Sequence, residues 1–315
     1  GGSEPPLVVP PPAPPPVESA APAPAPAPTP PPVAKAEPSE PPKPAAPVPV
    51  VKYSEDIATP ESVLYDEAGD RYLVSNINGS PGGVDNNGYI AELSPDGKVT
   101  NAKLIAGGAK NVKLDAPKGL GIAAGVLYVS DITKVRKFDL KTGAPKGDIA
   151  IPGATFLNDI AVGKDGRIYV ADTAVAGADL KPTGNDAVYV IDKGKVKALA
   201  KSKDLGGPNG LAVTDKGLLV NTFTSNEVYR LDDKGVRQDI TKLPAGGLDG
   251  LVAVGETLYV TSWQGAAIFR GKLGDKFEVV IPEIKGAADI GFDSKRGRLL
   301  VPRFLDNTVE VYDLK

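Results

Sequence analysis

Six polar residues stand at one recurring place in this chain, and five of them carry carboxylate or amide oxygens of the kind that bind a hard metal ion. Each lies at the head of a short apolar segment that is repeated along the sequence. The six residues are Glu61, Lys118, Asn158, Asn209, Asp249 and Asp289. The chain has no histidine and no cysteine, which excludes Ser–His–Asp and Cys–His catalysis and the zinc or haem sites that need these ligands. Carboxylate and amide oxygens remain, and they are the ligands that calcium prefers, with magnesium as the second choice.

Two features of this set leave other interpretations open. Asn-Gly and Asp-Gly are common turn dipeptides, so Asn209 and Asp249 taken singly are also explained as turn residues. Glu61 and Lys118 are poor turn residues, and six polar groups at one recurring position favour a binding site. The Lys118 ammonium would either orient an anionic substrate beside Glu61 and Asp289 or take the place of a cation in a salt-bridge network.

The repeated segment predicts the elements that position these residues. Its six copies centre on valines about 40 to 55 residues apart, a period typical of a four-stranded propeller blade. The valines are Val74, Val129, Val170, Val220, Val260 and Val301. Within one repeat, Pro208–Ile240, four short β-prone runs alternate with Gly, Asp and Asn turns, which indicates successive hairpins. The first strand of a blade lines the central channel, so a residue at its head should lie at the channel mouth. We therefore expect residues 48–315 to form an all-β, six-bladed propeller of four-stranded blades.

The spacing also predicts how the ring is covered and closed. Two long loops, Asn76–Asn87 and Thr173–Asn185, follow the second strands of blades 1 and 3 and should overhang the mouth. They are either lids that shape a ligand site or tolerated surface insertions. The last blade lacks a fourth strand, and Pro47–Tyr53 is the free β-prone segment that would supply it, since Pro49 is tolerated on an outer edge.

Residues 1–47 differ in composition from the rest. Runs of proline and alanine cannot build a packed core, so we expect a disordered tether that either spaces the propeller from a membrane or wall or only aids solubility. The chain has no methionine, so we expect that a leading segment was removed, either by a signal peptidase or by truncation. These features favour an exported bacterial protein of the periplasm or outer cell envelope. A lipid anchor ahead of Gly1 is one possible form of attachment. We also expect a partner in the envelope for the tether.

Two kinds of partner are not expected. No apolar run approaches the length of a transmembrane helix. The net charge is −3 and the lysines are dispersed, which argues against nucleic-acid binding.

Four of the strand-head residues carry a resemblance to a known family. The segments PESVLYDE with Glu61, FLNDIAVGKDGRIYVAD with Asn158, PNGLAV with Asn209 and LDGLVAV with Asp249 resemble, in residue type and chain order, the metal-binding strand heads of the regucalcin/gluconolactonase propellers. The calcium-dependent paraoxonase and diisopropylfluorophosphatase type propellers are related to that family. The resemblance implies that these four residues hold Ca²⁺, with Mg²⁺ or another divalent cation as the alternative. It also implies hydrolysis of a lactone or related ester, with Asp249 as the candidate catalytic base.

Other residues are candidate substrate contacts. Sugar-lactone members of that family carry an arginine two residues before the blade 3 asparagine, whereas this chain has Phe156, which implies a more apolar substrate. Trp263, the only tryptophan, either stacks on the ligand or lies on the rim, and Arg303 either lines the pocket with Phe304 or is solvated. The expected substrate-binding residues are Lys118, Asn158, Asp289, Phe156, Trp263 and Arg303.

Two functions from different classes remain at this stage. The first is a calcium-dependent hydrolase acting on a small-molecule lactone or ester at the channel mouth. The second is a non-catalytic envelope propeller that binds a protein, peptide or glycan there. The oxygen-ligand set favours the first, whereas the tether favours the second.

Overall fold

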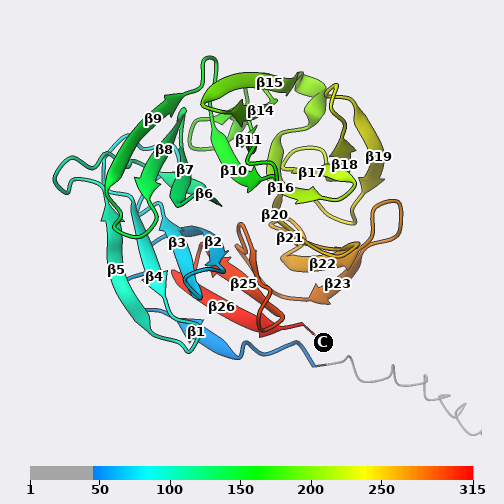
Figure 1. The fold of residues 1–315 in the computed structure, drawn as a ribbon. Helices are drawn as coiled ribbons and strands as arrows, with labels where there is room; N and C mark the ends of the chain where they lie inside the picture. The colour runs from blue at the N-terminus through cyan, green and yellow to red at the C-terminus, as the bar shows by residue number, and fades with distance from the viewer. Residues whose placement is uncertain (1–44, 315) are drawn as a thin grey trace, which may run out of the picture. The chain divides into compact units, whose positions relative to one another are not determined.

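The computed structural model describes residues 45–314, which form a closed ring of six four-stranded antiparallel sheets (Figure 1). Residues 1–44, and with them most of the expected tether, lie outside the described residues. The prediction of an all-β, six-bladed propeller is confirmed. The described residues contain one short helical turn, η1 (Lys203–Leu205). No helix among them is long and apolar enough to span a bilayer.

Each blade is a meander whose first strand lies at the channel and whose fourth lies at the rim (Figure 1). Blades 1 and 2 comprise β2 (Pro60–Asp66), β3 (Arg71–Asn76), β4 (Tyr89–Leu93), β5 (Val99–Ala106), and β6 (Pro117–Ala123), β7 (Val126–Asp131), β8 (Lys134–Asp139), β9 (Pro145–Ala150). Blades 3 and 4 comprise β10 (Leu157–Val162), β11 (Ile168–Asp172), β14 (Ala187–Asp192), β15 (Lys195–Lys201), and β16 (Pro208–Thr214), β17 (Gly217–Thr222), β18 (Glu227–Leu231), β19 (Arg237–Lys242). Blades 5 and 6 comprise β20 (Leu248–Val254), β21 (Thr257–Ser262), β22 (Ala267–Gly271), β23 (Glu278–Ile281), and β24 (Gly291–Asp293), β25 (Arg298–Arg303), β26 (Thr308–Asp313), β1 (Val51–Tyr53).

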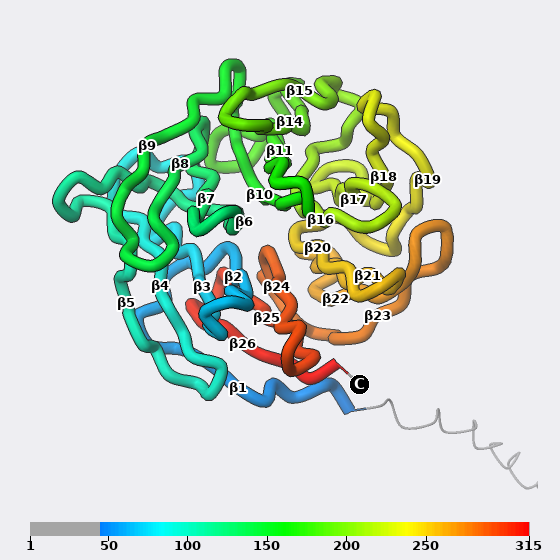
Figure 2. The backbone as a smooth tube through the Cα atoms, viewed as in Figure 1, coloured from blue at the N-terminus to red at the C-terminus, as the bar shows by residue number. Residues whose placement is uncertain are grey.

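The ring is closed by the N-terminal strand, as the sequence predicts. Strand β1 pairs antiparallel with β26, with Val51 opposite Val311 and Tyr53 opposite Val309, so the two ends of the described chain lie side by side (Figure 2). The paired segment is Val51–Tyr53 rather than the whole of Pro47–Tyr53. Prolines have no N–H to donate to a ladder, which explains why the segment containing Pro47 and Pro49 stays outside the strand.

The core lies between neighbouring blades. All six central valines of the repeated segment are fully buried, and the buried clusters combine residues of adjacent sheets, such as Val63 of blade 1 with Leu300 and Val309 of blade 6. Burial of each such side chain contributes about 1.5–3 kcal/mol. The repeated segment is therefore the middle layer of the ring, which explains its strong hydrophobicity.

In four blades a polar side chain of the second strand bonds the backbone of its own inner strand and that of the next blade, and we call this set of side chains the polar relay. Strand β20 carries a bulge between Leu248 and Leu251, which interrupts its hydrogen bonds to β21. Thr261 of β21 supplies the missing contact: its Oγ1 accepts from Gly250 N at 2.6 Å and donates to Ala288 O of blade 6 at 2.8 Å. The same pair of bonds recurs in blades 1, 2 and 4 through Ser75, Ser130 and Asn221, which bond the carbonyl oxygens of Lys118, Asn158 and Asp249.

The Asn-Gly and Asp-Gly dipeptides at the channel are not turns. Asn209–Gly210 lies within β16 and Asp249–Gly250 within β20, and neither glycine has a positive φ. A Cβ on Gly210 would lie 2.3 Å from Asp249 O, and one on Gly250 would lie 2.4 Å from Ile290 N. These glycines allow the inner strands to approach closely around the axis, so the turn interpretation of the two dipeptides is wrong.

Candidate functional site

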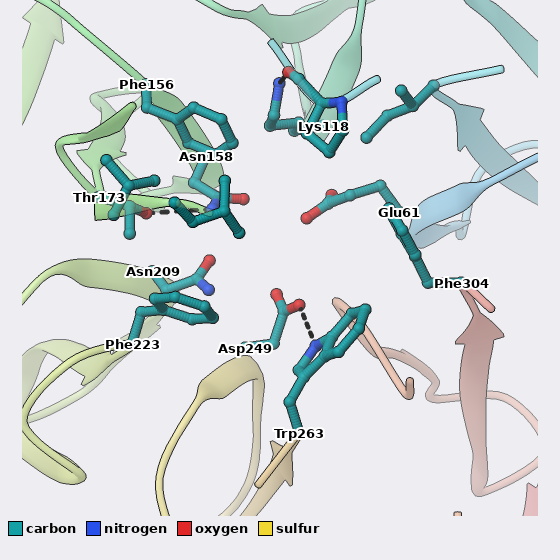
Figure 3. Close-up of a pocket in the computed structure, with 14 residues that line it drawn as sticks. Glu61, Lys118, Phe156, Asn158, Thr173, Asn209, Phe223, Asp249, Trp263 and Phe304 are labelled. Atoms are coloured by element: carbon teal, nitrogen blue, oxygen red, sulfur yellow. Dashed lines mark hydrogen bonds between the residues drawn. The ribbon is translucent and has the colours of Figure 1, made fainter. Parts of the chain in front are cut away.

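One end of the channel opens into a pocket of about 160 Å³. Five of the six strand-head residues line it, one from each of blades 1 to 5: Glu61, Lys118, Asn158, Asn209 and Asp249. The remaining walls are formed by Ile77, Pro81, Phe156, Thr173, Val175, Leu180, Phe223, Trp263 and Phe304. Figure 3 shows the polar groups converging on a common space with aromatic rings around them.

Four of these polar residues present an oxygen that has no hydrogen-bond partner. Seven buried side-chain atoms in residues 45–314 are unpaired, and four of them belong to this pocket. The four atoms are Glu61 Oε2, Asn158 Oδ1, Asn209 Oδ1 and Asp249 Oδ1. An unpaired buried polar group costs about 1–3 kcal/mol and is rare in folded proteins. The clustering of four such atoms therefore points to a ligand that they share.

The other polar atoms of these side chains are held in place. Asn158 Nδ2 donates to Thr173 Oγ1 at 3.0 Å, and Asn209 Nδ2 donates to Leu248 O at 3.0 Å. Trp263 Nε1 donates to Asp249 Oδ2 at 2.9 Å, drawn as a dashed line in Figure 3. Because the nitrogen of each amide is engaged elsewhere, its oxygen is left facing the pocket.

This donor set fits a hard divalent cation. It consists of two carboxylate and two amide oxygens, the ligand types of Ca²⁺ and Mg²⁺. Within residues 45–314 no three acidic side chains gather as a metal-binding group, so the two asparagine oxygens are needed to complete the set. Two carboxylates would also balance the charge of such a cation.

The electrostatics of the pocket point the same way. Burial, together with the negative charges of Asp249 and Asp289, raises the pKa of Glu61 well above its ordinary value, and Lys118 opposes the shift. Burial raises the pKa of Asp249 to about 7, although the Trp263 N–H stabilises the charged form. The two carboxylates are thus costly to ionise in this site, and a cation between them would remove that cost.

Lys118 is engaged by carbonyl oxygens rather than carboxylates. Its side chain is 1% exposed, and Nζ donates to Pro81 O at 2.6 Å and to Ala116 O at 3.0 Å, 4.5 Å from the centre of the Phe156 ring. Burial lowers the pKa of Lys118 to about 8. Among the ion pairs of residues 45–314, none involves Lys118, so the salt-bridge network that was one interpretation of this residue is not formed. Instead, Lys118 fastens the long loop of blade 1 over the pocket.

Two of the expected substrate contacts lie elsewhere. Asp289 is buried deeper in the channel, where its Oδ2 accepts from Ser62 Oγ at 2.7 Å, and it does not line the pocket. Arg303 turns toward its own blade, because Glu310 and Asp306 pair with its guanidinium at 3.0 and 2.7 Å. Of the Arg303–Phe304 pair, the pocket therefore receives Phe304. Neither Asp289 nor Arg303 is among the residues that line this pocket, and their contact with a substrate stays a prediction.

Sequence reasoning missed part of the wall, although the repeat contains a signal for it. The residue directly after each copy of the repeated segment turns into the pocket in five of six blades. These residues are Ile77, Thr173, Phe223, Trp263 and Phe304. Thr173 also orients Asn158. Both long loops contribute lining residues, among them Pro81, Val175 and Leu180.

Comparisons with known proteins place the fold. No protein-family model and no curated protein sequence matches this chain. Several solved structures do match it. A gluconolactonase from Xanthomonas campestris aligns with 82% of this chain and 88% of its own, at 21% identity and a TM-score of 0.63. Virginiamycin B lyase from Staphylococcus aureus aligns with 82% and 96%, at 16% identity and a TM-score of 0.59. A protein described as a putative gluconolactonase aligns with 82% and 91%, at 17% identity and a TM-score of 0.58. At these identities the likeness is one of fold, and the neighbours include the family that the strand-head residues resemble.

Proposed function

We propose that the pocket is the active site of a divalent-cation-dependent hydrolase that acts on a lactone or a related ester. The observation that carries this proposal is the convergence of four unpaired oxygens from blades 1, 3, 4 and 5 in one buried pocket. The gluconolactonases among the structural neighbours support the choice of reaction. Ca²⁺ is the preferred ion, and Mg²⁺ or another hard cation would suit the same donors.

Each residue then has a distinct part. Glu61, Asn158, Asn209 and Asp249 would hold the cation, which when bound would polarise the substrate carbonyl and stabilise the charge that develops on its oxygen. Asp249 is the candidate base, and Trp263 holds one of its oxygens in place, which fixes the carboxylate for proton transfer. The aromatic wall excludes water around the reacting group, which strengthens these electrostatic interactions.

Other functions are less well supported. A pocket of about 160 Å³ accepts part of a small molecule, whereas a protein or glycan would need an extended surface. The lyase neighbours include a variant described as catalytically inactive after loss of one histidine, and this chain has no histidine. The Pro/Ala-rich residues 1–47 support the additional proposal that the enzyme is exported and tethered in the cell envelope, with a partner for the tether there.

Titration calorimetry on the EDTA-treated full chain tests the metal site. We expect one-to-one binding of Ca²⁺ to the wild type and at least a tenfold loss of affinity in Asp249→Asn, because one charged ligand is removed. Asp215→Asn is the matched control, since its side chain is 92% exposed on another part of the ring, and it should bind as the wild type does. A wild type that binds neither Ca²⁺, Mg²⁺ nor Mn²⁺ would contradict the proposal, as would lactone hydrolysis that persists in EDTA.

A further inference from the structure

The wall above the four oxygens is apolar and largely aromatic. Phe156, Phe223, Trp263 and Phe304 face the pocket from blades 3 to 6 (Figure 3). The Trp263 and Phe304 rings meet edge to face, with their centres 5.3 Å apart. Aromatic edges and faces at this spacing form a site suited to a further ring.

Most of the polar atoms of the pocket already have partners, although Lys118 Nζ keeps one of its three donors. Lys118 Nζ is held by two carbonyl oxygens, Trp263 Nε1 by Asp249, and Thr173 Oγ1 by Asn158 and Pro208 O. The fully buried side-chain atoms of the lining residues that lack any partner are the four oxygens facing the cation position. Hydroxyl groups on a substrate would thus find few partners, and each one buried without a partner costs roughly tenfold in binding.

The size of the pocket limits what can enter it. A volume of about 160 Å³ is close to that of an apolar protein cavity of about 150 Å³ that holds one benzene molecule. One six-membered ring therefore fills the enclosed part of the pocket, and a second fused ring would have to press against the wall or project from the mouth.

The blade 3 insertion sets this limit. It folds into a hairpin of β12 (Val175–Ala176) and β13 (Lys181–Pro182), closed by the bond from Thr183 N to Ala174 O at 2.7 Å. The hairpin places Val175 and Leu180 against the pocket. Leu180 is half-buried, so its side chain can be shortened without opening the core.

We propose that the substrate carries a single apolar, aromatic or similarly flat ring, that polyhydroxylated sugar lactones are poor substrates, and that Leu180 sets the upper size. This inference rests on the proposed function for its hydrolytic part. Its binding part is independent, because it concerns which molecules the walls accept.

Binding is measured without chemistry through the one tryptophan, which lines the pocket. Acetanilide, which carries one ring and resists hydrolysis, should change Trp263 fluorescence in the Ca²⁺-loaded full chain, whereas gluconate and glucose should not. A response to gluconate or glucose that equals or exceeds the acetanilide response, or no response to any of the three, would overturn the inference.

Hydrolysis is measured with phenyl acetate, 2-naphthyl acetate and glucono-1,5-lactone. We expect kcat/KM for phenyl acetate to exceed that for the sugar lactone by about 100-fold or more, since at least two hydroxyls lack partners. Leu180→Ala should raise kcat/KM for 2-naphthyl acetate by about tenfold and leave phenyl acetate within about threefold. Leu305→Ala is the matched control, because Leu305 is exposed and lies outside the pocket.

The binding and hydrolysis experiments together distinguish a wrong inference about the substrate from a wrong proposed function. Efficient hydrolysis of the sugar lactone with weak action on phenyl acetate would leave the proposed function standing and overturn the inference. Acetanilide binding at the tryptophan with no hydrolysis of any ester would support the binding part of the inference and contradict the proposed function. An unchanged preference in Leu180→Ala would overturn the role of Leu180.

Discussion

At the scale of single residues, the buried carboxylates of the channel link stability to pH. Burial raises the pKa of both Asp249 and Asp159 to about 7 from an ordinary value of 3.8, and it raises that of Glu61 as well. Without a cation, the folded protein therefore holds more protons than the unfolded chain between about pH 4 and about pH 7. The contribution to stability is present at the acidic end of this window and is lost as pH rises through the folded-state pKa values.

We predict that the Tm of the EDTA-treated protein falls as the pH is raised from about 5 to about 8. Circular dichroism during heating measures it. In Asp249→Asn the fall should be smaller, because an amide does not titrate. The lowered pKa of Lys118, about 8, acts only on the alkaline side, where stability should recover between about pH 8 and about pH 10.5. A Tm that rises between about pH 5 and about pH 8, or an equal slope in the variant, would show that these carboxylates are not buried as described.

The residues of the site differ in how far sequence could predict their place. Glu61, Asn209 and Asp249 were predictable because the repeat fixes where each inner strand begins, and that place is the channel mouth. Asp289 was not, because β24 begins only at Gly291 and Asp289 instead forms an isolated bridge with Ser62. The direction of Arg303 depends on Glu310, which the sequence does not reveal as its partner.

At the scale of the elements, the strand register is completed by side chains as well as by the backbone. In blades 1, 2, 4 and 5 the inner-strand bulge leaves an N–H without a ladder partner, and a polar residue of the second strand accepts from it while bonding the next blade. The sequence contains these residues as the serine, asparagine or threonine inside the repeated segment. Their role could not be predicted, because it depends on a bulge that hydrophobic patterning does not reveal.

We predict that Thr261→Val lowers the free energy of unfolding by about 1–3 kcal/mol for each of the two groups it orphans, Gly250 N and Ala288 O. Valine has nearly the same shape, so the loss reports hydrogen bonding rather than a cavity. Urea unfolding at constant pH measures it. Thr257→Val is the matched control in the same strand, since no side-chain hydrogen bond of Thr257 is present among the described residues, and it should change stability by less than about 0.5 kcal/mol. Equal effects of the two substitutions would remove the relay as the explanation.

At the scale of the whole molecule, the ring has two kinds of closure. At the rim, β1 joins the start of the described chain to its end, and Tyr53 OH donates to Ser94 O across to blade 1. At the hub, by which we mean the channel mouth, four blades each direct an unpaired oxygen into one pocket. The rim closure was predictable from the missing fourth strand of blade 6. For the hub, the sequence predicts only which polar residues gather there. It does not predict which of their atoms are unpaired, because that depends on contacts between blades.

A cation at the hub would bridge blades 1, 3, 4 and 5 and should therefore stabilise the ring as a unit. A ligand that binds only the folded state stabilises it by about 2.7 kcal/mol at a free concentration 100 times its Kd. For a domain of this size each kcal/mol raises Tm by roughly 2–4 °C, so saturating Ca²⁺ should raise the Tm of the wild type by roughly 5–10 °C at neutral pH. Differential scanning calorimetry with and without EDTA measures the shift. Asn209→Ala, which removes one hub oxygen, should lose most of it. A shift of the same size in that variant would place the cation away from the hub, and the four unpaired oxygens would then need a different ligand.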